Sequence, residues 1–229
     1  MVVDTLPKAL INMAKKKPQS IAMRQKVFGL WEDITWNDYL NKVECVALAL
    51  KTFGLKKGDK AAIIGENQPE WLYSALGIMS VGGIFVGVYP TNPAPECEYI
   101  IGHSDSVAFF CEDEEQLDKA LVFRHNTPLL KKIIVWDMEG LRHFKDPMVM
   151  SFDELIALGD KMRQDDPSMF MKLVDAGCGD DLASIIYTSG TTGRPKGAML
   201  SQEGYLYVGR QTAMMAKVTD KDETISFLP

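Results

Sequence analysis

Hydrophobic and polar positions along the chain follow two patterns in turn, the three-to-four-residue spacing of a helix and the short apolar run of a buried strand. Thr35 with Asp38 resembles a capping box at the start of the first such helix, and Gly54 is a natural end to it. Residues 60–64 then form a short apolar run typical of a strand. Within residues 35–53 the apolar side chains lie at helical spacing: Tyr39, Leu40, Val43, Val46, Ala47 and Leu50.

The same alternation continues to the end of the sequence. Further helices are expected over residues 69–81, 95–103, 114–124, 151–163 and 201–216. Strands are expected over residues 84–88, 107–111, 132–136, 182–187 and 224–228. Helix-capping signals support three of these helices: Asn67 or Gln68 before Pro69, Ser151 with Glu154, and Ser201. Residues 137–181 are polar, rich in methionine and without a clear strand, so we expect this region to wrap the surface.

Strands and helices that alternate, with strands apolar enough to be buried on both faces, predict an α/β fold with largely parallel sheets flanked by helices. The final run, Thr224–Leu228, reads as a strand that has only begun when Pro229 ends the sequence. Such a strand normally leads into an element that covers it, which favours a fragment of a longer protein. A terminal edge strand is the alternative.

Composition narrows the class of protein. The 229 residues are 46% hydrophobic and 24% charged, which excludes disorder for most of the chain and fits one or two domains. The formal net charge is −6, so a protein that coats nucleic-acid phosphates is not expected. The three histidines lie far apart in the sequence and give no metal-site spacing. The four cysteines form no C-x-x-C pair and predict reduced, mostly buried thiols of a cytoplasmic protein: Cys45, Cys97, Cys111 and Cys178.

The uncharged stretch 71–95 is long enough to span a bilayer. Gly82 and Gly83 divide it, and prolines end it, so a buried helix followed by a buried strand explains it better than a transmembrane span. Its large side chains are therefore expected in the core: Trp71, Tyr73, Met79 and Tyr89. The basic run at residues 15–17 is interpreted as a solvated helix end, because stable membrane anchoring needs more basic charge or a lipid.

One segment carries recognisable chemistry. Residues 188–197 read TSGTTGRPKG, with three glycines that let backbone N–H groups converge, four hydroxyl side chains, and the cations Arg194 and Lys196. These groups suit a polyphosphate. The segment is neither a Walker A loop nor a dinucleotide fingerprint, and Pro195 fixes the backbone just before Lys196. The alternative is a solvent-exposed hairpin loop, in which Gly, Ser and Thr serve only as turn residues.

The run YTSGTTGRPKG at 187–197, followed by AMLS, resembles the phosphate-binding signature of the adenylate-forming enzymes, the AMP-dependent synthetases and ligases. GLWEDITWNDY at 29–39, the stretch 58–101 and SFLP at 226–229 resemble the long-chain acyl-CoA synthetases of that superfamily. The resemblance implies that residues 1–229 are the N-terminal portion of an AMP-binding domain. The remainder of that domain and a small C-terminal domain would follow Pro229.

The resemblance also implies a two-step reaction. A fatty acid carboxylate attacks the α-phosphate of ATP to give an acyl-adenylate and pyrophosphate, and coenzyme A then displaces AMP. The residues that would line the phosphates are Ser189, Gly190, Thr191, Thr192, Gly193 and Lys196. Thr188 would lie near Mg²⁺, as a ligand or one water removed. Arg194 holds a variable position and is expected to face solvent. One departure is Gln202 after Ser201, where many members have a histidine.

The catalytic lysine and the adenine- and ribose-binding residues of such enzymes would all lie beyond residue 229, so the fragment alone is expected to make no acyl-CoA. Fatty acid, ATP and CoA would be partners of the parent enzyme, and nucleic acid would not. Peripheral membrane contact and a homodimer stay open. Two alternatives remain: a naturally short, non-catalytic α/β scaffold that binds a partner, and an adenylating ligase for another carboxylic acid.

Overall fold

The computed structural model describes residues 2–188 and 193–226. The strands are β1 (Ile21–Val27), β2 (Leu30–Thr35), β3 (Lys60–Ile64), β4 (Ile84–Val88), β5 (Ser106–Cys111), β6 (Lys132–Val135), β7 (Val149–Ser151), β8 (Leu182–Thr188) and β9 (Lys196–Ser201). The α-helices are α1 (Leu6–Lys16), α2 (Trp36–Thr52), α3 (Pro69–Ser80), α4 (Ala94–His103), α5 (Glu114–Phe123), α6 (Phe152–Asp165), α7 (Met169–Asp175) and α8 (Gln202–Met215). A 3₁₀ turn, η1, covers Arg124–Asn126.

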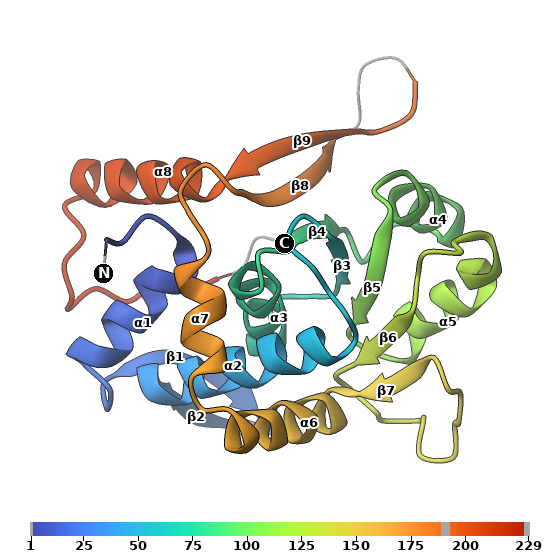
Figure 1. Cartoon of the computed structure of the whole chain (residues 1–229), viewed down its shortest axis with the longest axis horizontal. Coiled ribbons are helices and arrows are strands. Elements are labelled where there is room, and N and C mark those ends of the chain that lie inside the picture. The colour runs from blue at the N-terminus through green and yellow to red at the C-terminus, as the bar shows by residue number, and fades with distance from the viewer. Residues whose placement is uncertain (1, 189–192, 227–229) are drawn as a thin grey trace.

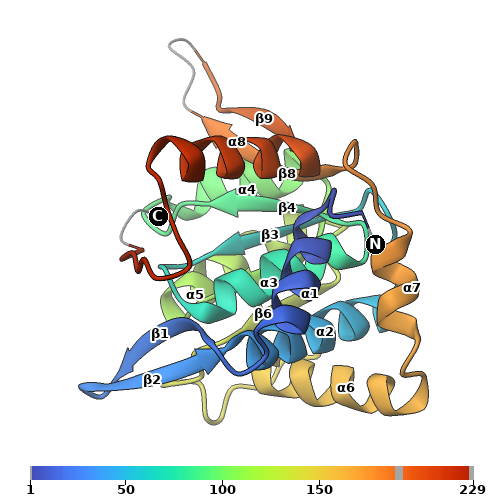
Figure 2. The same cartoon turned by 90° about the vertical axis from the view of Figure 1, so that its left-hand side faces the viewer.

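Seven strands form one sheet in the order β7-β6-β5-β3-β4-β8-β9 (Figure 1). All neighbours pair in parallel except β8 and β9, which are antiparallel. A separate antiparallel hairpin of β1 and β2 projects from the body of the molecule (Figure 2). The predicted α/β fold with largely parallel strands flanked by helices is therefore confirmed.

Two apolar layers fill the space above and below the sheet. Ile63 and Phe110 point to the layer that also contains buried side chains of α1, α2, α3, α6 and α7. Ile64 and Phe109, each one residue away along its strand, point to the layer shared with α4 and α5. Successive side chains of a strand point to opposite faces, so a strand covered on both sides must be apolar at every position. This explains the uninterrupted apolar runs of β3 to β6.

The expected helix starts are confirmed at three places. Thr35 and Asp38 form a full capping box at α2, and Ser151 and Glu154 form another at α6. The Ser201 hydroxyl accepts a hydrogen bond from the Gly204 N–H at the start of α8. Capping side chains satisfy backbone N–H groups that have no partner inside the helix, so these boundaries can be read from local sequence.

Three expectations are corrected, and one element was not predicted at all. The helix expected to end at residues 15–17 is present as α1, whereas the β1–β2 hairpin matches no expectation. Residues 137–181 contain a strand, β7, which extends the sheet beside β6. Thr224–Ser226 are not part of a strand, and residues 227 and 228 of that expected strand lie outside the described residues. Tyr89 is 48% exposed instead of buried, whereas Tyr73 and Met79 are in the core as expected and Trp71 is half-buried.

The thiols follow the expected pattern. Cys45, Cys97 and Cys111 are buried and unpaired, and Cys178 is exposed. Burial raises the pKa of the Cys97 thiol to about 11 and that of Cys111 well above its usual value. Within the folded protein these two side chains therefore behave as small apolar groups.

The two ends of the described chain are held together by contacts between distant residues. The backbone N–H of Leu6 donates to Oε1 of the buried Gln202 side chain at 3.0 Å. Nζ of Lys8 donates to the Gly177 carbonyl at 2.7 Å, and Arg210 donates to the Val3 carbonyl at 2.9 Å. Gln202, which stands where many relatives were expected to carry histidine, therefore satisfies the first backbone amide of α1.

The loop between β6 and β7 is fastened to η1 by an ion pair whose removal should have a pH-dependent cost. Arg124 donates a hydrogen bond to Asp146, which lowers the pKa of that carboxyl below its usual value. A lowered folded-state pKa adds stability above the unfolded pKa and loses it as pH falls. Asp146→Asn should lower the free energy of unfolding by about 1 kcal/mol at pH 7 and by much less below about pH 3. Urea titrations at both pH values measure this difference.

Asp220→Asn is the matched control for that experiment. Asp220 pairs with Lys17, but the Asp220 side chain is 67% exposed and that of Lys17 40%, so solvent screens the pair and no measurable change is expected. An Asp146→Asn cost that does not shrink at acid pH would contradict the assignment.

Candidate functional site

The described residues of the segment 188–197, namely Thr188 and residues 193–197, lie in or beside the β8–β9 hairpin at one edge of the sheet. β8 lies in the sheet beside β4, and β9 pairs antiparallel along its outer side (Figure 1). This strand pairing is compatible both with a phosphate-binding turn and with the alternative of a plain hairpin turn. Four of the predicted phosphate ligands, Ser189, Gly190, Thr191 and Thr192, lie outside the described residues.

The two strands bring Thr188 and Lys196 together. These residues are directly opposite each other as the last pair of the β8–β9 ladder, and both are exposed. Gly193, three residues before Lys196, has a φ of +106°, a conformation that favours glycine. Among the described residues no carboxylate forms an ion pair with Lys196. A cation and a hydroxyl thus stand side by side at the base of the turn, where an anion can reach both.

Helix α4 holds the hairpin from one side. The hydroxyl of Tyr99 donates to the Pro195 carbonyl at 3.2 Å. The guanidinium carbon of Arg194 lies 5.1 Å from the centre of the Tyr99 ring, within the range of a cation–π contact. Arg194 is exposed, as expected, but it rests on this ring. Arg194 and Pro195, the two residues before Lys196, are therefore both held against α4.

A second contact from α4 holds the start of the turn. The Tyr187 hydroxyl and Nδ1 of His103 are 2.7 Å apart, and the Tyr99 and Tyr187 rings meet edge to face. Burial raises the pKa of the Tyr187 hydroxyl. Tyr187 immediately precedes Thr188. The aromatic cluster of Tyr99, His103 and Tyr187 consequently fixes the end of β8 against α4.

The carboxyl ends of β3, β4 and β8 meet at the same edge, because these strands are parallel neighbours. Open α/β sheets bind ligands outside the carboxyl ends of their strands. Tyr89 is the first residue after β4 and is exposed at this edge. We expected Tyr89 in the core, because the apolar run of the sequence continues through it. Pro90 was the signal that the strand ends before this residue. Tyr89 therefore joins the candidate site.

An open groove adjoins the turn on the side of α4. Its volume is about 620 Å³, and Arg194 contributes to its wall. Other residues along it are Pro95, Glu98, Tyr99, His103 and Asn126. The groove gives solvent and solutes access to the side of the hairpin that carries Arg194.

A metal could join this site through oxygen atoms. Over residues 2–188 and 193–226, His, Cys, Asp and Glu side chains form no group of three that could hold a metal ion. Mg²⁺ often keeps several waters and is held largely by substrate phosphates. The exposed Thr188 hydroxyl beside Lys196 fits such a role.

In the same described part of the chain, no helix is both long and apolar enough to cross a membrane.

Comparison with known proteins gives consistent findings. A sequence profile of the family described as AMP-binding enzyme matches residues 11–229. The long-chain-fatty-acid–CoA ligase ACSBG2 of Homo sapiens is 33% identical over 210 residues, which are 91% of this chain and 31% of that protein. ACSBG2 of Mus musculus is 30% identical over 232 residues, 98% of this chain and 34% of that protein. This chain thus spans about a third of the length of these curated relatives.

A solved structure shares the fold. The anthranilate CoA ligase AuaEII in complex with anthranoyl-AMP matches with a TM-score of 0.75 and 23% identity, over 90% of this chain and 36% of that chain. At this identity the likeness concerns the fold alone.

Proposed function

Because the chain belongs to the AMP-binding enzyme family, we propose that it carries the phosphate-binding portion of an ATP-dependent, AMP-forming long-chain acyl-CoA ligase. The observation that supports this most strongly is the 33% identity, over nearly the whole chain, to a long-chain-fatty-acid–CoA ligase. The reaction joins a fatty acid and CoA. ATP is converted to AMP and pyrophosphate through an acyl-adenylate.

The residues of the turn supply charge and hydrogen-bond donors for the phosphates of ATP. In this proposal Lys196 neutralises phosphate charge, and Ser189, Gly190, Thr191, Thr192 and Gly193 donate hydrogen bonds. Attack on the α-phosphate releases pyrophosphate, so fixed donors and a cation on the leaving phosphates lower the barrier. The Thr188 hydroxyl holds or orients Mg²⁺, which balances phosphate charge. The contacts from α4 support Lys196 in a fixed direction, which reduces the reorganisation needed when ATP binds.

We further propose that residues 1–229 are the N-terminal portion of the AMP-binding domain in a longer protein. The curated relatives are about three times as long as the stretch that this chain matches. The exposed apolar side chains of α8 and β9, among them Met199, Tyr207 and Met215, are consistent with a surface that further chain would cover. The catalytic lysine would then come from that further chain, and residues 1–229 alone would form no acyl-CoA.

The test uses the protein isolated from its source cells with an antibody raised against this chain. We expect an intact mass well above 25.5 kDa and release of AMP that requires a long-chain fatty acid, ATP and CoA together. Release of AMP only with aryl or short-chain acids would replace the substrate class. A species of 25.5 kDa without ligase activity would overturn the proposal in favour of a short scaffold protein. The recombinant 229-residue chain is assayed in parallel, and any acyl-CoA from it would refute its expected inactivity.

A further inference from the structure

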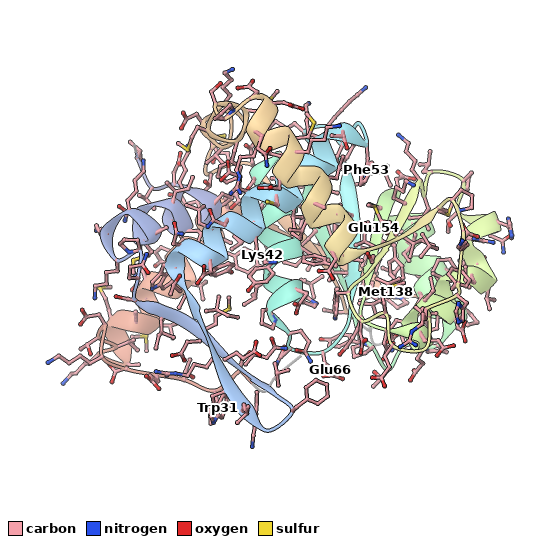
Figure 3. All side chains as sticks on the ribbon, turned by 90° about the horizontal axis from the view of Figure 1, so that it is seen from below. Trp31, Lys42, Phe53, Glu66, Met138 and Glu154 are labelled. Carbon is pink, nitrogen blue, oxygen red and sulfur yellow. The ribbon has the colours of Figure 1, made fainter. Side chains whose placement is uncertain are left out.

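The outer end of the β1–β2 hairpin exposes three large apolar side chains. Phe28 at the turn is fully exposed, Leu30 is 75% exposed and Trp31 is 67% exposed. The hairpin projects from the body, and Trp31 lies near its outer end (Figures 2 and 3). Such a cluster on a protruding element gains nothing from the core of the domain.

The backbone of the turn makes Phe28 more unusual. Val27 pairs with Leu30, so Phe28 and Gly29 form a two-residue turn, with φ of +46° and +88°. Such turns favour Asn or Asp followed by Gly, because both central residues have positive φ. A bulky side chain at positive φ is an outlier that carries strain. Neither turn geometry nor packing therefore accounts for phenylalanine at this position.

Polarity changes in steps along the hairpin from the turn to its base. The first rung, Val27 with Leu30, is apolar. The second pairs Lys26 with Trp31, and Nζ of Lys26 lies 6.0 Å from the centre of the Trp31 ring. Acidic residues begin only farther in: Glu32 on the third rung, and Asp33 on the fourth, where Arg24 binds it. The outermost charge is therefore positive.

These steps match the cross-section of a membrane surface. Strand residues advance about 3.4 Å each, so the turn and first rung extend roughly 7 Å beyond the second rung. Apolar faces of interfacial segments enter a bilayer by about 5–10 Å, and Trp with Lys or Arg is typical of the headgroup level. We propose that the tip of the β1–β2 hairpin inserts into the surface of a lipid bilayer that contains anionic lipid, with Phe28 and Leu30 below the headgroups and Trp31 and Lys26 among them.

A protein partner is less well matched to this tip. A stable protein interface needs about 800 Å² on each partner, with a polar rim around a buried centre. The apolar tip consists of a few side chains on a narrow, convex hairpin, which a fluid lipid surface can surround without a complementary socket. The inference stands on the hairpin alone and does not depend on the proposed ligase activity.

The test is co-sedimentation of the 229-residue chain with vesicles made of equal parts phosphatidylcholine and phosphatidylserine. The double variant Phe28→Asn, Leu30→Thr should reduce the partition coefficient about tenfold or more. Asn-Gly suits the turn and Thr suits a strand, so this variant is expected to fold, as urea unfolding will verify. Lys26→Gln should weaken binding to these vesicles and leave binding to pure phosphatidylcholine unchanged.

Two further measurements locate the contact. Trp31 fluorescence should be quenched by brominated lipid, and the variant Trp31→Phe should lose that part of the signal. Met215→Gln is the matched control, because Met215 is an exposed apolar residue on α8 and not on the hairpin. It should bind vesicles as the unmodified chain does.

Three results would overturn the inference. They are no binding of the unmodified chain to either vesicle, equal binding by the double variant, and a loss in Met215→Gln as large as that in the double variant. Self-association in sedimentation velocity that the double variant abolishes, without vesicle binding, would instead assign the tip to a second copy of this chain.

Discussion

Replacement of Lys196 by alanine should weaken the binding of pyrophosphate by about 10- to 150-fold, the equivalent of roughly 1.5–3 kcal/mol for a charged hydrogen bond. Lys196 is exposed at the base of the turn and, among the described residues, has no carboxylate partner that would compete with a phosphate. Thr188 stands opposite it, so one anion can contact both. Titration calorimetry with pyrophosphate, and separately with ATP and Mg²⁺, measures the loss.

Two controls make the Lys196 result specific. Lys161→Ala removes an exposed lysine on α6, outside the hairpin, and should leave the affinity unchanged. Lys196→Arg keeps the charge but changes its geometry, so it should retain part of the affinity. Unchanged affinity in Lys196→Ala would refute the assignment of the turn as the phosphate site, and an equal loss in Lys161→Ala would reveal a non-specific effect of net charge.

The largest expected loss of stability comes from Gly159→Ala on α6. A Cβ built at Gly159 would lie 1.9 Å from the backbone carbonyl oxygen of Cys45 on α2, where the two helices make close contact. That neighbour is backbone, so a whole helix must move to make room. Helix propensity alone would favour alanine by about 1 kcal/mol. Overpacking of this kind costs about 1–3 kcal/mol or more. We expect a net loss of about 2 kcal/mol or more in the free energy of unfolding.

Gly209 on α8 offers a matched control for that substitution. It is also a helical glycine, but a Cβ there would meet no atom within 4 Å. Gly209→Ala should therefore raise the free energy of unfolding by about 0.5–1 kcal/mol, through propensity and the unfolded state. Urea titration should show a lower free energy of unfolding for Gly159→Ala and a higher one for Gly209→Ala, although the chemical change is the same. A stabilising Gly159→Ala would contradict the tight approach of α6 to α2.

The sheet could be predicted from the sequence where burial and sequence pattern coincide. β3 to β6 and β8 are covered on both faces by apolar layers, so their runs stand out without any knowledge of their neighbours. The β1–β2 hairpin gives no such signal, because most of its residues are exposed or half-buried and its pairing partners set its structure. β7 was missed because its three residues derive their strand character from β6.

The candidate site, like the sheet, could be predicted from the sequence only in part. The turn could be recognised from consecutive residues, since glycines, hydroxyls and a lysine occur together there. The contacts that fasten it could not, because Tyr99 and Pro195 lie 96 positions apart, and His103 and Tyr187 lie 84 positions apart. Only the parallel arrangement of β4 and β8 brings α4 against the hairpin. Tyr89 was misplaced because the apolar run continues one residue past the end of its strand.

The hydrogen bond from Leu6 to Gln202 has a consequence for the order in which parts of the chain fold. α1 is synthesised before the other described helices, yet the partner of its leading amide is a side chain synthesised 196 residues later. Contacts between such distant positions form late, because a long loop must close before they are gained. α1 is thus secured late, by the first residue of α8, the helix that follows the β8–β9 hairpin. Changes in the chain next to α1 should therefore perturb the structure of β9 and α8 before that of the centre of the sheet.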